Sequence, residues 1–187
     1  MLYYSREDVI DKQVLKQPDV LMLSFLLPEK FSAEIIKANW DYYEPKSVND
    51  SSLSHTVHCV TACQTGNIEE AYKYFQSGIT IDIGDNPVSS DDGIHAGALG
   101  GVWIMLTQGF CGIHERDGQL WMSPRLPQQW NLLEFPFRWQ GGKLRIKVTA
   151  ENVHIWASDT LHFNLYGKEA VAHGNTWTEF VIKNGGC

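Results

Sequence analysis

The chain has 187 residues, of which 43% are hydrophobic and 20% charged, so it is long and apolar enough to fold around a core and is not a disordered polymer. Its net charge of −7, without a cluster of Lys and Arg, argues against a nucleic-acid-binding protein. The longest apolar run, residues 20–27, is far shorter than the roughly 20 residues of a membrane span. We therefore expect no nucleic-acid partner and no membrane.

The N-terminal residues, together with the lack of a membrane-length apolar run, favour the cytoplasm. Acidic residues stand near the N-terminus, where a secretory signal would have a basic start and an apolar stretch. Cys59, Cys63, Cys111 and Cys187 lie mostly inside apolar segments, which is typical of buried, reduced thiols and not of a disulfide framework. The sequence therefore predicts a cytoplasmic protein.

Residues 8–110 have the pattern of helices. Pro18 is expected in the first turn of a helix that Pro28 ends, because proline lacks the N–H that a helix interior needs. Ser32 is expected to cap a second helix over residues 33–43.

A third and a fourth helix follow. The third is predicted over about residues 52–65, with Gly66 as its C-terminal stop. Asn67 and Glu70 form a capping box for the fourth, over residues 68–81, because each side chain can pair with the other residue's backbone N–H.

A loop rich in Gly, Asp, Asn and Ser spans residues 82–93, and a fifth helix over about 94–108 begins with small residues. Several of these helices carry little polar surface and need neighbours on two sides, as in an α/α barrel. Five helices cannot close a barrel of six hairpins, so we expect a partial (α/α)6 barrel over residues 1–111.

From about residue 113 the pattern changes to short alternating strands. Asp117-Gly118 and Gly141-Gly142 are strong hairpin signals, because both turns require residues that tolerate positive φ. Seven or eight such strands predict a small antiparallel β-sandwich over residues 112–187. The fold class predicted for the whole chain is α+β, with helical hairpins followed by this β-domain.

Two predicted helix starts share the chemistry of an anion site. Ser51 and Ser52 stand at the start of the third helix, and His95 stands at the start of the fifth. A helix N-terminus presents unpaired N–H groups and a positive dipole end, to which hydroxyls and an imidazole add donors. Small residues after His95 would let a ligand approach the backbone closely. The alternative is that the serines are ordinary caps and the glycines are helix-packing contacts.

Lys16 and Gln17 precede the first helix and offer donors and an acceptor that could bind sugar hydroxyls, although the residues alone are more typical of a solvated helix entry. The four residues His55, His58, Cys59 and Cys63 have i, i+4 spacings that could bring metal ligands together. Without a second Cys or His pair, buried thiols and satisfied histidines explain them more simply, and we predict no metal site.

Paired carboxylates for acid–base catalysis are not evident. Glu44 follows an aromatic run, and Asp50, Asp91 and Asp92 stand near the two predicted helix starts. Nothing in the pattern selects one of them, so no catalytic residue is assigned.

Four segments together resemble, in order, the C-terminal part of glycoside hydrolase family 65, which contains the inverting phosphorylases of maltose, trehalose, kojibiose and nigerose. The segments are LKQPDVLMLSFLLPEKF, NWDYYEPKSVNDSSLSHTVHCVTACQTGNIEEAYKYF, DDGIHAGALGGVWIMLTQGFCGI and RDGQLWMSPRLPQQWNLLEFPFRWQG. The resemblance runs from about Leu15 to Val148.

The resemblance implies a role for each candidate residue. Lys16 and Gln17 match the pair that holds the glucosyl unit, Ser51 and Ser52 match the serines of the phosphate site, and His95 matches a histidine that contacts phosphate. The implied substrates are a glucose-containing disaccharide and inorganic phosphate, with no metal or organic cofactor. The implied reaction is phosphorolysis of an α-glucoside with inversion, in which a Glu protonates the leaving oxygen.

The family's general acid and the first helices of its barrel precede the region that is matched here. We therefore expect a C-terminal part of such an enzyme that binds sugar and phosphate but is inactive alone. Alternatives are a non-catalytic carbohydrate- or phosphate-binding module, a subunit that associates with itself or with an N-terminal half, and a piece of a family hydrolase that uses water. One departure is that Ala96-Gly97-Ala98 follow His95, where many family members carry a larger polar residue.

Overall fold

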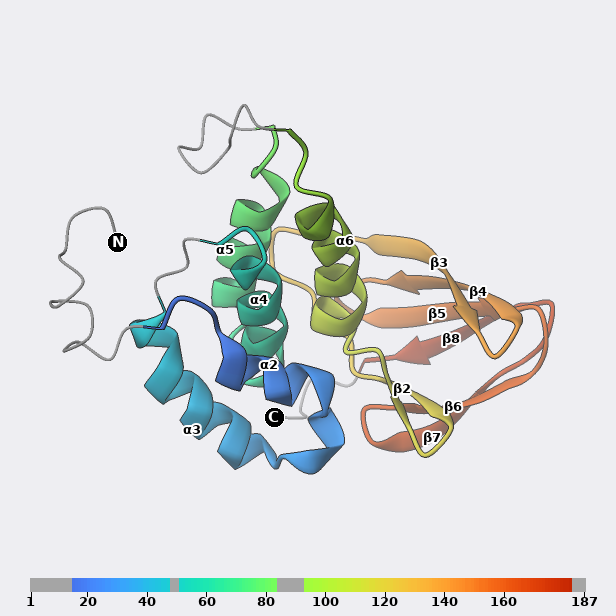
Figure 1. Ribbon diagram of the computed structural model, residues 1–187. Helices are drawn as coiled ribbons and strands as arrows, with labels where there is room; N and C mark the ends of the chain where they lie inside the picture. The colour runs from blue at the N-terminus through green and yellow to red at the C-terminus, as the bar shows by residue number, and fades with distance from the viewer. Residues whose placement is uncertain (1–14, 48–50, 84–92, 183–187) are drawn as a thin grey trace, which may run out of the picture. The chain divides into compact units, whose positions relative to one another are not determined.

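The computed structural model describes residues 15–47, 51–83 and 93–182. Helices form the first part of the chain and two small sheets form the second (Figure 1). Clustering of contacts divides the chain into two compact units between Gly109 and Phe110, close to the boundary predicted after residue 111. The α+β class predicted from the sequence is confirmed.

Five α-helices lie in the described part of the first unit. They are α2 (Asp19–Leu26), α3 (Ala33–Tyr43), α4 (Ser54–Gln64), α5 (Ile68–Ile79) and α6 (Ala96–Ile104). Short 3-10 turns follow α2 at Pro28–Lys30 and α3 at Glu44–Lys46, and a π-helical turn, Met105–Phe110, continues α6. None of the described helices has the length and apolar character of a membrane span.

The predicted caps explain where several helices begin and end. The Ser32 side chain accepts a hydrogen bond from the N–H of Ile35 at the start of α3, and Asn67 accepts one from the N–H of Glu70 at the start of α5. Gly66 has a φ of 82°, the left-handed conformation that ends α4.

The third helix begins later than predicted. Residues 51–53 form a turn closed by a 3.0 Å hydrogen bond from the N–H of Ser54 to the carbonyl of Ser51, so α4 starts at Ser54.

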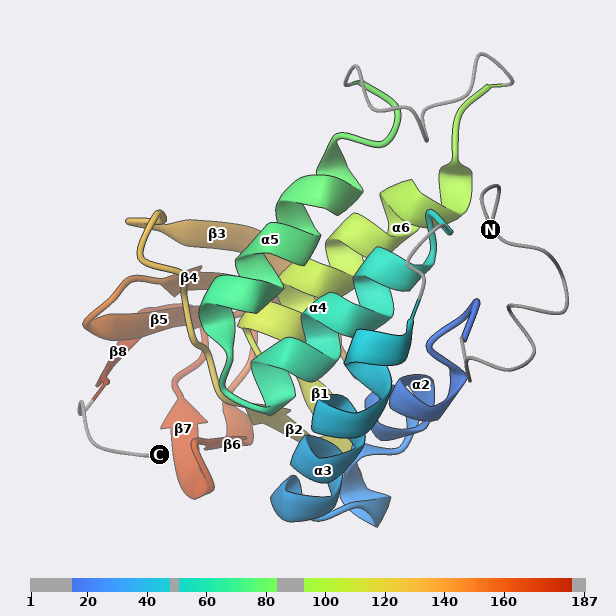
Figure 2. The ribbon, with the colours of Figure 1, turned by 90° about the vertical axis from the view of Figure 1, so that its left-hand side faces the viewer.

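Helix α4 is the centre of the first unit. Nine of its eleven residues are buried, which a helix can achieve only with neighbours on several sides. Helices α2, α3, α5 and α6 all contact it, and Figure 2 shows it between them. Two buried polar side chains of α4 bond to carbonyls of the helix itself, whereas Nδ1 of His55 and Nε2 of His58 are buried without a hydrogen-bond partner among the described residues. Thr61 donates to the carbonyl of Val57 at 2.9 Å, and Nδ1–H of His58 donates to that of Ser54 at 2.9 Å.

Helices α4 and α6 approach closely through glycines. A Cβ at Gly97 would lie 2.8 Å from Cδ2 of Leu53, and a Cβ at Gly101 would collide with the Thr56 hydroxyl. Farther along, Gly109 lies beside Val60. These contacts follow the same order on both helices, so α4 and α6 run in the same direction and begin at the same end of the unit (Figure 2).

An aromatic and histidine cluster fills the space beside α4. His58 is fully buried and stacks on Tyr74 with ring centroids 4.8 Å apart, while Trp40 meets its edge. The Tyr74 hydroxyl donates a 2.6 Å hydrogen bond to Oε1 of Glu44. Burial lowers the pKa of His58. Burial also lowers the pKa of His55, and the nearby His58 imidazole lowers it further. Both histidines are therefore held neutral in the folded chain.

The second unit is built of eight short strands. They are β1 (His114–Arg116), β2 (Gln119–Met122), β3 (Leu133–Trp139), β4 (Gly142–Val148), β5 (Asn152–Ala157), β6 (Leu161–Leu165), β7 (Lys168–Ala172) and β8 (Trp177–Val181). They form two four-stranded sheets with the orders β1-β2-β6-β7 and β3-β4-β5-β8. The two predicted hairpins are present, with Asp117, Gly118 and Gly141 at positive φ in their turns.

The two sheets enclose one core. Inward side chains from both sheets, including Leu120, Phe163 and Ile155, belong to a single buried cluster, and Phe163 meets Phe180 edge-on at 5.4 Å. One pairing departs from the prediction, because β2 and β6 are parallel with Leu120 opposite Phe163. The expectation of a wholly antiparallel sandwich is wrong at that pair, since an alternating pattern identifies strands but not their neighbours.

Replacing Gly101 by alanine should destabilise the chain, because the added Cβ collides with Thr56. We expect the free energy of unfolding to fall by about 1–3 kcal/mol, the usual cost of overpacking. Gly100→Ala is the matched control, because nothing lies within 4 Å of a Cβ at that position and alanine favours a helix by about 1 kcal/mol over glycine. Equal effects of the two substitutions in urea denaturation would contradict this packing.

Acid should weaken the helical unit. The unfolded chain protonates His55 and His58 near the ordinary pKa of 6.5, whereas the folded chain resists protonation at both. Their contribution to stability is therefore complete above pH 6.5 and is lost as the pH falls toward the folded pKa values, at no more than about 1.4 kcal/mol per pH unit for each histidine. Urea unfolding at a series of pH values measures this slope. His58→Gln should reduce it, and an unchanged slope would show that His58 is not responsible.

Candidate functional site

The starts of α4 and α6 lie side by side. Leu53, which directly follows the serine pair, packs against Gly97, which lies two residues after His95. Neither start has a hydrogen bond from the side chain of its own N-cap residue, Leu53 or His95. Two parallel helices thus present their N-terminal ends next to each other, and the positive ends of their dipoles reinforce each other there.

His95 is held by a carboxylate that comes from the turn after α5. Its backbone N–H donates to Asp82, with distances of 3.1 and 3.2 Å to the two carboxylate oxygens, and its Nδ1 lies 2.7 Å from Oδ1. The imidazole side chain is 28% exposed and that of Asp82 only 15%. His95 is therefore fixed at the mouth of the helix start, with part of the ring open to solvent.

Ser51 and Ser52 lie in the turn that leads into α4, and both are partly buried. The Ser51 hydroxyl accepts a long hydrogen bond, 3.4 Å, from the N–H of Leu53, and its carbonyl closes the turn onto Ser54. The serine pair is thus positioned immediately before the helix start that contacts α6.

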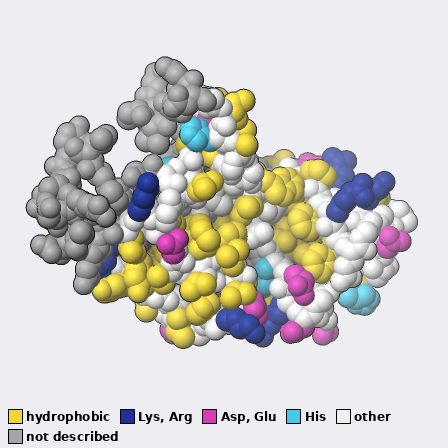
Figure 3. Space-filling model, viewed as in Figure 1, with side chains coloured by type: hydrophobic (Ala, Val, Ile, Leu, Met, Phe, Trp, Pro, Cys, Tyr) yellow, Lys and Arg dark blue, Asp and Glu magenta, His cyan; other side chains and the backbone are white. Residues whose placement is uncertain are grey.

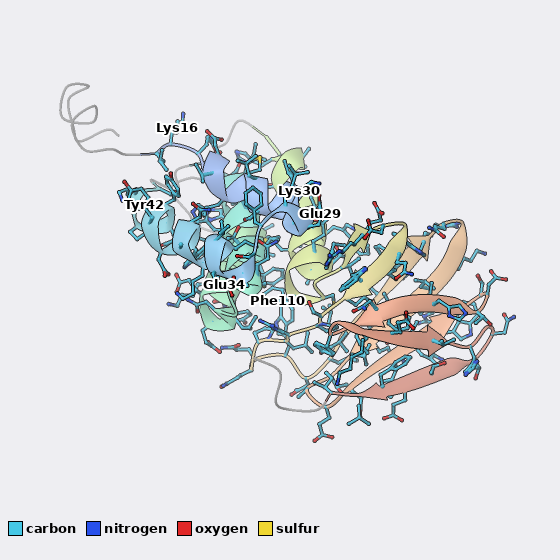
Figure 4. All side chains as sticks on the ribbon, turned by 90° about the horizontal axis from the view of Figure 1, so that it is seen from below. Lys16, Glu29, Lys30, Glu34, Tyr42 and Phe110 are labelled. Atoms are coloured by element: carbon cyan, nitrogen blue, oxygen red, sulfur yellow. The ribbon has the colours of Figure 1, made fainter. Side chains whose placement is uncertain are left out.

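Lys16 and Gln17 are brought to the same helix start. Oε1 of Gln17 accepts a 3.3 Å hydrogen bond from the hydroxyl of Ser54, the first residue of α4. One residue before the pair, the N–H of Leu15 donates to the carbonyl of Lys46 at 2.9 Å. Figure 4 shows Lys16 at the entry to α2, and its side chain is exposed. Gln17 is therefore anchored, while Lys16 is accessible.

All five predicted site residues thus belong to segments that meet at one end of the helical unit. Paired helix N-termini, hydroxyls and an imidazole are suited to bind an oxyanion, because each supplies a donor or a positive partial charge. An amide and an ammonium group beside them are suited to polyhydroxylated ligands.

Two glycines after His95 do not serve the close approach of a ligand that the sequence suggested. Gly97 and Gly101 face Leu53 and Thr56 of α4, so their lack of a side chain serves helix packing. Gly100, by contrast, has open space around it. The packing alternative is correct for Gly97 and Gly101.

The candidate carboxylates do not form a catalytic pair in the described part of the chain. Glu44 accepts the Tyr74 hydrogen bond within the aromatic cluster, and Asp50, Asp91 and Asp92 lie outside the described residues. Within residues 15–47, 51–83 and 93–182, no group of three or more His, Cys, Asp or Glu could hold a metal ion.

The described cysteines are free and buried. A hydrogen bond with Cys63, together with burial, raises the pKa of the Cys59 thiol far above its ordinary range, which makes that thiol unreactive.

Sequence reasoning missed Asp82, Ser54 and Leu53. Asp82 was placed only in a polar loop, and its partner stands 13 residues later, a separation that no local pattern reports. Ser54 lay inside the predicted helix rather than at its start. Leu53 gave one usable signal in the sequence, because a leucine directly after a serine pair has no role in a helix cap and can instead pack against a neighbouring element.

Both units match family models. The family model "Glycosyl hydrolase family 65 central catalytic domain" matches residues 1–104, and the model "Glycosyl hydrolase family 65, C-terminal domain" matches residues 113–172. The family resemblance inferred from the sequence is therefore confirmed.

Similar proteins of known name are sugar phosphorylases. The chain is 44% identical to the kojibiose phosphorylase of Escherichia coli over 90% of its own length and 22% of that protein. It is 41% identical to the kojibiose phosphorylase of Halothermothrix orenii over 83% of its length, and to the α,α-trehalose phosphorylase of Thermoanaerobacter brockii over 82%. The chain spans about a fifth of the length of these relatives.

The fold is also similar to that of a solved structure described as a kojibiose phosphorylase from the human microbiome. That similarity has a TM-score of 0.86 at 30% identity, and covers 92% of this chain and 26% of the other. With more than half of its residues matched by the central-domain model and most of the rest by the C-terminal model, the chain belongs to glycosyl hydrolase family 65.

Proposed function

We propose that this chain is the sugar- and phosphate-binding C-terminal part of an inverting α-glucoside phosphorylase. The observation that carries the proposal is the meeting of the α4 and α6 starts through Leu53 and Gly97, with Ser52 next to one contact residue and His95 near the other. The proposal also draws on the named relatives, which are phosphorylases of kojibiose and trehalose.

Phosphate is the ligand proposed for the paired helix starts. The serine hydroxyls and the helix N–H groups would donate to its oxygens, and the His95 imidazole would donate or accept one proton. A net charge of −7 does not attract anions at long range, so the affinity must come from these local donors.

The glucosyl unit is proposed to bind beside Lys16 and Gln17. The hydrogen bond from Ser54 to Oε1 of Gln17 leaves the amide NH₂ of Gln17 to donate to a sugar hydroxyl. Because Ser54 is also the first residue of α4, the sugar site and the anion site share one rigid element. Such sharing fixes the distance between the two substrates.

In the proposed reaction, a phosphate oxygen attacks the anomeric carbon and forms a new C–O bond as the glycosidic C–O bond breaks with inversion. The departing oxygen takes a proton from a general acid. Because phosphate and not water is the nucleophile, the attack requires no second carboxylate to activate water. This chain's residues hold and orient phosphate and glucose. The general acid is proposed to come from sequence outside the matched fifth of the relatives.

The first alternative is a non-catalytic module that retains the same binding contacts. The second is a subunit whose site is completed by a separately encoded partner, and the exposed apolar surface of the helical unit favours this second alternative. Use of water in place of phosphate, as in a hydrolase, would leave the paired helix starts without their anion.

The cytoplasmic location stays a prediction.

Phosphate binding by the chain tests the proposal directly. In calorimetric titration with inorganic phosphate, Ser52→Ala and His95→Ala should each weaken binding by about fivefold or more, because a hydrogen bond to a charged group contributes at least about 1 kcal/mol. Ser32→Ala is the matched control, since Ser32 also stands at a helix start but caps α3. Absence of phosphate binding in the unchanged chain, or equal weakening by Ser32→Ala, would overturn the assignment.

The helical unit should associate with the part of a family 65 catalytic domain that lies outside the segment matched here. Large hydrophobic side chains are exposed on its helices, and Figure 3 shows hydrophobic side chains gathered over this part of the molecule. They include Leu23 and Leu26 of α2, Leu27 directly after α2, Ile35 and Tyr42 of α3, and Leu99 and Trp103 of α6.

The test supplies the region of the E. coli kojibiose phosphorylase that precedes the matched segment as a separate chain. We expect co-purification and release of glucose 1-phosphate from kojibiose and phosphate by the mixture, but not by this chain alone. Leu26→Lys should weaken the association, whereas Val181→Lys, at an exposed apolar position on β8, should not. Turnover by the isolated chain would instead show that a local carboxylate serves as the acid.

A further inference from the structure

The contact between Asp82 and His95 spans the loop between α5 and α6. The Asp82 carboxylate accepts a hydrogen bond from the backbone N–H of His95, whose nitrogen lies 3.1 and 3.2 Å from the two carboxylate oxygens. Its Oδ1 also lies 2.7 Å from Nδ1 of the His95 ring. Two bonds to one residue fix both the position of the backbone and the rotation of the ring. Asp82 is the less exposed partner, so the contact is partly shielded from water.

The chemistry of the pair determines where the imidazole carries its protons. An ionised carboxylate can only accept a hydrogen bond, so Nδ1 of His95 must be the protonated nitrogen in the neutral ring. Nε2 is then the nitrogen with a free lone pair in the neutral ring. It is also the ring nitrogen that does not bond to Asp82.

We propose that Asp82 is a positioning residue of the anion site, which holds His95 as the Nδ1–H tautomer and so presents the other ring nitrogen, Nε2, to phosphate. This inference rests on the proposed function, because phosphate is the ligand that it assigns to Nε2.

A ring held in this way can bind both forms of phosphate that coexist near neutral pH. With the dianion, a protonated Nε2 donates to a phosphate oxygen. With the monoanion, a neutral Nε2 accepts from the P–OH group. The two complexes contain the same number of protons and differ only in which side of one hydrogen bond holds the proton, so the site does not have to select one form.

The first experiment reads the tautomer by ¹⁵N NMR of imidazole-labelled chain without phosphate, with His95 assigned by the loss of its signal in His95→Gln. Neutral His95 should show a protonated Nδ1 and an unprotonated Nε2. Asp82→Asn should shift the ring toward the Nε2–H tautomer, and Asp82→Glu should retain the original one. An Nε2–H tautomer in the unchanged chain overturns the proposal even if no variant folds.

The second experiment measures phosphate affinity by calorimetry. Asp82→Asn should weaken binding by about tenfold, the lower end of what is lost when the group that orients a ligating histidine is removed. Asp82→Glu should recover most of that loss. Asp41→Asn removes the same charge from an exposed pair with Lys37 on α3 and should leave affinity unchanged. Equal weakening by Asp82→Asn and Asp41→Asn would mean that only net charge matters, and would overturn the positioning role.

The two experiments separate this inference from the proposed function. If the unchanged chain does not bind phosphate while His95 shows the Nδ1–H tautomer, the phosphate assignment fails and the orienting contact stands. If phosphate binds and the tautomer is the opposite one, the function stands and the role of Asp82 is wrong. Thermal melting of each variant shows whether a loss of binding reflects a loss of folding.

Discussion

The burial of α4 is the constraint on which the helical unit depends. A helix with nine of eleven residues buried must find neighbours on several sides, and α6 comes close enough only because Gly97 and Gly101 leave room for Leu53 and Thr56. The same contacts align the two helices in one direction. As a result, a packing requirement places two helix N-termini side by side, where we propose that phosphate binds.

Hydrogen bonds connect the buried helix α4 to the side chains of the proposed site. The carbonyl of Ser54 accepts from the buried His58 imidazole, and its hydroxyl holds Gln17, so one residue links the core to the proposed sugar contact. Asp82 plays the corresponding part for His95. In each case a partly shielded polar group fixes the orientation of a more exposed one, which lowers the entropy that a ligand would have to remove on binding.

The two units differ in how completely each buries its apolar surface. The sheets of the second unit close on a single core to which both contribute. The helical unit instead exposes leucines, an isoleucine and a tryptophan on α2, α3 and α6. This contrast agrees with a chain that spans about a fifth of its relatives and matches part of their central catalytic domain. It also explains why the proposed catalysis requires a partner for the helices and not for the sheets.

Local features of this protein were determined by the sequence itself. The caps at Ser32 and Asn67 and the turn at Asp117-Gly118 depend on hydrogen bonds and φ angles among residues a few positions apart. Only the tertiary structure decided that Leu53 meets Gly97, that Asp82 holds His95 and that β2 pairs in parallel with β6. The physical reason is that each of these contacts joins segments whose adjacency depends on how the whole core is filled, and a one-dimensional pattern does not record which buried faces become neighbours.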